Sequence, residues 1–183
     1  MAIDLKKGQR VEVGLQKVAV GLGWDPNDGT GAAFDLDASA FMLRNGKIPE
    51  EGYFVFYNNL VSADHAVQHM GDALDGVGDG DDETIQVDMS AVDPEVDEII
   101  IVVTIHEYET RRQNFGQVRN SFIRIYDIIS GNELCKYELD EDFSVESAIE
   151  FGRLYRRNSA WRFEAVGRGY EGGLQYFVDK YVS

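Results

Sequence analysis

Cysteine is almost absent from this chain of 183 residues, and its scarcity excludes two kinds of site. Because Cys135 is the single cysteine, the chain has no internal disulfide and no zinc cluster built from several thiolates. Proline is also rare, with three in all, and no proline-rich linker or internal repeat divides the sequence. At this length we therefore expect a single domain over residues 1–183.

Long apolar runs are missing as well. The longest uncharged one is IIIVVTI, Ile99 to Ile105, whereas a membrane-spanning helix needs about 20 apolar residues. The first ten residues contain no apolar stretch of the kind that precedes a signal-peptide cleavage site. Since 44% of the chain is hydrophobic, it can still bury a core. We expect a soluble, cytoplasmic protein without a transmembrane segment.

Positive charge is absent from the middle of the chain. Between Ile48 and Thr110 there are 16 acidic residues and no Lys or Arg, and all 17 basic residues lie outside this stretch. The formal net charge is -16. Nucleic acid is therefore excluded as the expected partner, because binding to phosphates requires a surface rich in Lys and Arg.

The hydrophobic pattern is that of strands. Residues 34–43 alternate, with Leu36 and Ala38 on one side and Asp37 and Ser39 on the other. Residues 172–182 alone have helical spacing. We expect an all-β fold, an antiparallel β-sandwich of two sheets with a short C-terminal helix. The other expected strands are 9–15, 17–24, 53–57, 83–89, 97–107, 120–128, 133–139, 149–157 and 161–167.

Two segments concentrate acidic residues among glycines. In GDALDGVGDGDDET, residues 71–84, six of the twelve residues from Asp72 to Glu83 are acidic, and GWDPNDGTGAAFDLD, residues 23–37, contains four more aspartates. Like charges about 4 Å apart repel by roughly 1 kcal/mol in water and roughly 4 kcal/mol at an effective dielectric near 20. A calcium ion, which takes six to eight oxygen ligands in flexible geometry, would offset such repulsion. A solvated acidic turn is the alternative.

Four stretches carry a resemblance that extends over essentially the whole chain: VGLGWD (20–25), FDLDASAFML (34–43), GDGDDETI (78–85) and FGRLYRRNSAWRFEAVGRGYEGGL (151–174). In these the sequence resembles the TerD family of tellurium-resistance and bacterial stress proteins. The resemblance implies a β-sandwich that binds calcium at one edge and has no catalytic activity. It also implies a role in the stress response through partners, namely other stress or tellurium-resistance proteins, either in the cytoplasm or at the inner face of the membrane.

The resemblance further implies two calcium ions and a set of acidic ligands. The matching positions are Asp25, Asp35, Asp37, Asp72, Asp79, Asp81, Asp82 and Glu83. The chain departs from the family pattern at Thr30 and Ala33, where members often have acidic residues, and at Ala73, where many have asparagine. These departures leave the ligand count of the first acidic segment open.

Other interpretations of the same residues remain open. The acidic segments would also suit a metal-dependent hydrolase acting on a phosphorylated or nucleotide substrate, or a structural module in which calcium only maintains the fold. His65 and His69 are four apart, a spacing that would hold a transition metal on a helix. We expect them instead in an exposed turn, and Cys135 as a small residue of the core.

Overall fold

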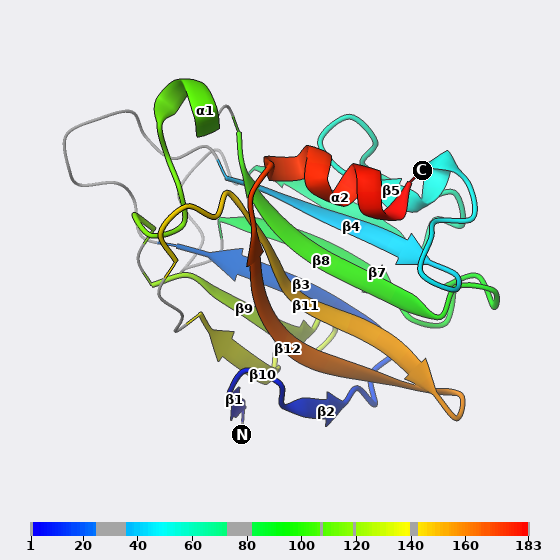
Figure 1. Cartoon of the computed structure of the whole chain (residues 1–183). Coiled ribbons are helices and arrows are strands. Elements are labelled where there is room, and N and C mark those ends of the chain that lie inside the picture. Colours follow the sequence, from blue (N-terminus) through cyan, green and yellow to red (C-terminus); the bar gives the residue numbers. More distant parts are fainter. Residues whose placement is uncertain are drawn as a thin grey trace.

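Two sheets stacked face to face form the body of the molecule in this computed structural model (Figure 1). The structure describes residues 2–24, 36–72, 82–106, 108–118, 120–139 and 143–182. Over this part of the chain each sheet has six strands. The predicted all-β sandwich is therefore confirmed.

The first sheet is antiparallel except at one edge, where β1 runs parallel to β10 and Ile3 lies opposite Cys135. β1 is only three residues long, and the other described pairs of this sheet are antiparallel, as the predicted sandwich requires. In spatial order the strands are β1 (Ile3–Leu5), β10 (Glu133–Glu138), β9 (Phe122–Asp127), β3 (Lys17–Gly23), β7 (Glu83–Asp88) and β6 (Val67–Asp72).

The second sheet is antiparallel throughout its described pairs and carries the C-terminal helix on its outer face (Figure 1). In spatial order its strands are β2 (Arg10–Glu12), β12 (Ala160–Tyr170), β11 (Ala148–Arg157), β8 (Glu98–Ile105), β4 (Leu36–Leu43) and β5 (Phe54–Val55). The described helices are η1 (Glu51–Tyr53), α1 (Tyr108–Arg111) and α2 (Gly173–Tyr181). The helix predicted for residues 172–182 is confirmed as α2.

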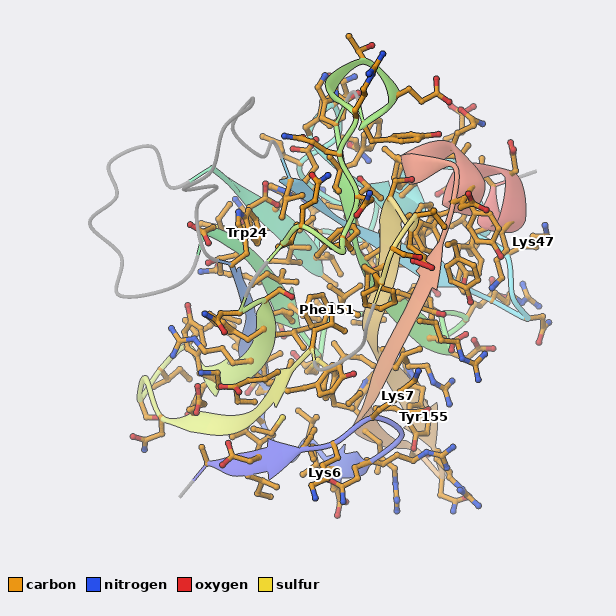
Figure 2. All side chains as sticks on the ribbon, turned by 60° about the vertical axis from the view of Figure 1, so that its left-hand side comes forward. Lys6, Lys7, Trp24, Lys47, Phe151 and Tyr155 are labelled. Carbon is orange, nitrogen blue, oxygen red and sulfur yellow. The ribbon has the colours of Figure 1, made fainter. Side chains whose placement is uncertain are left out.

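Alternation along β4 decides what each sheet face contacts. Ala38 and Met42 belong to the core between the sheets, whereas Phe41 belongs to a second cluster beneath α2. Phe151 fills the space between the layers (Figure 2). The period of two thus assigns one face of β4 to the core between the sheets and the other face to the cluster beneath α2.

Two local predictions fail. The strand expected over residues 53–57 is reduced to β5, two residues long, because residues 51–53 form η1 and a tight turn follows at Phe56. His65 does lie in an exposed turn, but His69 lies in β6 and is only 5% exposed. His69 is buried because it shares the inward face of β6 with Val67, and β7 fixes that register.

Candidate functional site

The strand ends that flank the two acidic segments meet at one edge of the sandwich. β3 ends at Gly23, where the first segment starts, and β7 begins at Glu83, where the second segment ends. Glu83 lies opposite Leu22 of β3 on one side and Asp72, the last residue of β6, on the other. Three of the four flanking ends are therefore neighbours in one sheet.

The side chain of Glu83 reaches the fourth end. It points between the sheets, is 2% exposed, and accepts a hydrogen bond from the backbone N–H of Ala38, near the start of β4. The same carboxylate oxygen, Oε2, lies 3.5 Å from Nε2 of His69. A buried carboxylate needs such partners, because an isolated charge away from water is very costly. Glu83 therefore ties both sheets together where the acidic segments begin and end.

Asp82 makes a second tie at the surface. Its Oδ2 accepts a hydrogen bond from the backbone N–H of Trp24 at 2.9 Å, and its own N–H donates to the carbonyl of Leu22 at 2.7 Å. Trp24 lies at the start of the first acidic segment, and Asp82 is part of the second. The two segments are thus joined directly through backbone and carboxylate.

Asp37 does not share the position of Glu83. It alternates with Ala38 in β4 and so faces the outer side of the second sheet. There it lines a hollow of about 270 Å³ together with Thr104, Tyr108 and Gly173. The side chains of Asp37 and Glu83 therefore lie on opposite faces of the second sheet.

The remaining predicted ligands are only partly placed. Asp25, Asp35, Asp79 and Asp81 lie outside the described residues, and Asp72 is placed by its backbone at the end of β6. Among the described residues, no group of three or more His, Cys, Asp or Glu is arranged to hold a metal ion. The ligand set remains a prediction.

His69 is the residue of this edge that sequence reasoning missed. The signal that would have found it is the alternation of Val67 and His69 with the polar Gln68, which marks one inward face. Cys135, by contrast, is the core residue predicted. It is fully buried, and burial raises the pKa of its thiol to about 12.

Comparison with known proteins assigns the family. The TerD domain model matches residues 1–181. The chain belongs to the TerD family. It is 49% identical to the tellurium resistance protein TerD of Serratia marcescens over 187 residues, covering 99% of this chain and 97% of that one. General stress protein 16U of Bacillus subtilis is 50% identical over 189 residues, covering 99% of this chain and 97% of that one.

A solved structure agrees with the fold of this TerD-family protein. A homologue of the telluride resistance protein from Streptomyces coelicolor A3(2) superposes with a TM-score of 0.70 at 24% identity, covering 90% of this chain and 95% of that one. The prediction of a tellurium-resistance and stress family is confirmed. Within the described residues, no helix is both long and apolar enough to cross a membrane.

Proposed function

We propose that this TerD-family protein binds calcium through its two acidic segments and acts in the stress response through protein partners. The observation that carries the proposal is the meeting of the four flanking strand ends around Glu83. Since the described ends of both segments meet at this edge, we expect most of their carboxylates to gather there, and a divalent cation would offset their repulsion at neutral pH.

The chemistry of the available donors fits a hard cation. Carboxylate and backbone carbonyl oxygens, which the two segments supply in quantity, are the ligands that calcium takes. Asp82 uses one oxygen for the N–H of Trp24, and a carboxylate has further lone pairs for an ion. Glu83 fixes the buried side of this edge through its hydrogen bond with the N–H of Ala38. We expect Asp25, Asp35, Asp72, Asp79 and Asp81 to supply the other carboxylates.

The role we propose is binding rather than catalysis. The relatives are named for tellurium resistance and general stress, and neither name states a reaction. Bound calcium would stabilise the folded state by mass action and fix the shape of the edge that partners contact. Those partners would be other stress or tellurium-resistance proteins, in the cytoplasm or at the inner face of the membrane.

Calcium titration of two matched double variants tests the proposal. In Asp79→Asn/Asp81→Asn the calcium-induced rise in Tm should fall by more than half, because two carboxylates leave the acidic segment. In Asp4→Asn/Glu12→Gln, which neutralises two exposed acidic residues on β1 and β2, the rise should match that of the wild type. Calorimetry should show saturable binding of calcium, and magnesium should raise Tm much less. An unchanged calcium response in the Asp79/Asp81 variant would remove these residues from the site.

A further inference from the structure

A row of aromatic rings leads from beneath α2 to the open edge of the second sheet. Phe41 packs against Tyr181 of the helix, with ring centroids 5.2 Å apart. Phe54 stacks on Phe41 at 4.4 Å, and Phe56 stacks on Phe54 at 4.2 Å. Tyr57 continues the row at 5.2 Å from Phe56 and is 49% exposed. The helix therefore covers only the first part of an aromatic surface.

Two hollows lie over this row, one at each end of α2. At the carboxyl end a hollow of about 460 Å³ is lined by Phe54, Phe56 and Val182. At the amino end the hollow of about 270 Å³ that contains Asp37 is also lined by Tyr57 and Leu174. The two hollows share no lining residue, but the ring contact between Phe56 and Tyr57 leads from one to the other. We call the surface formed by both hollows and the aromatic row between them the α2 groove. Leu174 and Val182 are eight residues apart, or about 12 Å along a helix.

The rim of the α2 groove is acidic. Glu51 lines the hollow at the carboxyl end, and Asp37 and Glu109 line the one at the amino end. Of the described residues that line either hollow, none is Lys or Arg. Lys47, close in sequence, is directed at the end of α2, where its Nζ donates to the carbonyl of Lys180 at 2.6 Å (Figure 2).

We propose that the α2 groove docks an amphipathic helix of a partner protein, with apolar side chains over the aromatic row and Lys or Arg residues on the acidic rim. A helix of two to three turns matches the length of the groove and would lie beside α2, extending the cover of the same sheet. An apolar surface with a rim of one charge sign selects a partner of the opposite sign. Phe54 and Phe56 would be the anchors, and Glu51 and Glu109 would set orientation and rate of association.

Other occupants fit the charges less well. An anionic membrane surface attracts basic segments, and it would be repelled by Glu51, Asp37 and Glu109. The groove is lined by described residues of β4, β5, β8, η1, α1, α2 and adjoining loops, and the proposed docking contacts involve no ion. The proposal therefore does not depend on calcium binding.

Two-dimensional NMR of the full chain tests the groove with a designed probe, an amphipathic leucine–lysine peptide long enough for about five helical turns. A peptide of the same composition in scrambled order has the same charge, so it measures general attraction to an acidic protein. We expect saturable shifts at Phe54, Phe56, Tyr57 and Val182 with the amphipathic peptide, both with calcium and with a chelator present. The scrambled peptide should leave these four signals unchanged.

Matched charge reversals supply the affinity test. Glu51→Lys/Glu109→Lys should weaken binding of the amphipathic peptide by about tenfold, since both rim charges change sign. Asp4→Lys/Glu12→Lys changes the net charge equally, but β2 is the opposite edge strand of the second sheet, so its effect should stay below about twofold. Tyr57→Ala, at an exposed turn, should weaken binding without altering the fold seen by circular dichroism.

Several outcomes would overturn the proposal. These are equal binding of the scrambled peptide at the same residues, equal weakening by both charge reversals, or peptide shifts confined to residues outside the groove. Concentration-dependent dimerisation that shifts the groove signals without peptide would assign the groove to a second copy of the chain. Shifts of the same signals on vesicles of phosphatidylglycerol and phosphatidylethanolamine would assign it to a lipid surface. A failure of calcium binding alone would leave the peptide result unaffected.

Discussion

At the scale of single residues, Glu83 links the acidic part of the sequence to the core. Its neighbours Asp82 and Thr84 reach the outside, whereas its own carboxylate lies between the sheets beside Ala38 and His69. The cost of burying this charge is offset by groups from two other strands. The position therefore depends on contacts that are distant in sequence.

Replacement of Glu83 by leucine tests this role. Glu83→Leu keeps the volume near that of the native side chain but leaves the buried N–H of Ala38 without its acceptor, so we expect a loss of about 2 kcal/mol in the free energy of unfolding. Urea denaturation with a chelator present measures the loss without any contribution from calcium. Thr84→Val, on the outward face of the same strand, should change stability by less than about 0.5 kcal/mol. Equal stability of Glu83→Leu and wild type would show that the carboxylate does not hold the two sheets together.

Sequence patterns identified Glu83 as part of an acidic segment but gave no sign of its burial. Glycines and aspartates on its amino-terminal side indicate a loop, and the buried face of β7 begins at Glu83 itself. His69 was missed although it alternates with Val67, because the pairing with β7 is what shows that residues 67–72 form a strand. Cys135 was predicted correctly because the alternation of residues 133–139 is enough by itself to indicate a strand with Cys135 on its buried face.

At the scale of elements, β12 shows how the two sheets are fitted together. Gly167, in the C-terminal half of this strand, has a φ of +65°. It lies against the hydroxyl of Tyr137, which belongs to β10 of the other sheet. A Cβ at this position would collide with that oxygen. The strand therefore requires glycine here for both its backbone conformation and the close approach of the sheets.

Two glycine-to-alanine variants separate these causes. Gly131, in the turn before β10, has a φ of +77° and open space around its Cα. Gly131→Ala should therefore lower the free energy of unfolding by about 1 kcal/mol, because alanine is strained at a positive φ and meets no other atom there. Gly167→Ala should cost that amount plus about 1–3 kcal/mol for the clash with Tyr137. Urea denaturation compares them, and equal losses would mean that the contact between β12 and β10 is loose enough to absorb a methyl group.

The long strands were predictable, whereas the extents of three short edge strands were not. β4, β8, β11 and β12 have eight to eleven residues each, and an alternating pattern or a run of β-branched and aromatic residues marks each of them in the sequence. β1, β5 and β6 are edge strands of two to six residues, and their partners decide whether they form at all. A pattern of two or three side chains is too short to show a period, so tertiary pairing supplies the missing information.

At the scale of the whole molecule, charge is divided between regions of the surface. The stretch from Ile48 to Thr110, which holds 16 acidic residues and no Lys or Arg, includes β5 to β8 and part of both hollows of the α2 groove. Lys6 lies away from α2, at the edge formed by β1 and β2 (Figure 2). Self-repulsion on the acidic side should therefore limit stability whenever calcium is absent.

The dependence of Tm on salt tests where that repulsion is concentrated. With a chelator present, raising NaCl from about 20 mM to about 0.5 M shortens the screening length from roughly 20 Å to roughly 4 Å and should raise Tm by several degrees. Asp79→Asn/Asp81→Asn should raise Tm at low salt and flatten this dependence, because both changes fall in the most crowded acidic segment. Asp4→Asn/Glu12→Gln removes the same charge near Lys6 and Arg10 and should leave the slope close to that of the wild type. If both double variants flatten the curve equally, net charge alone governs the effect. The acidic segments would then not be crowded enough to require a cation, which would remove the electrostatic basis of the proposed calcium site.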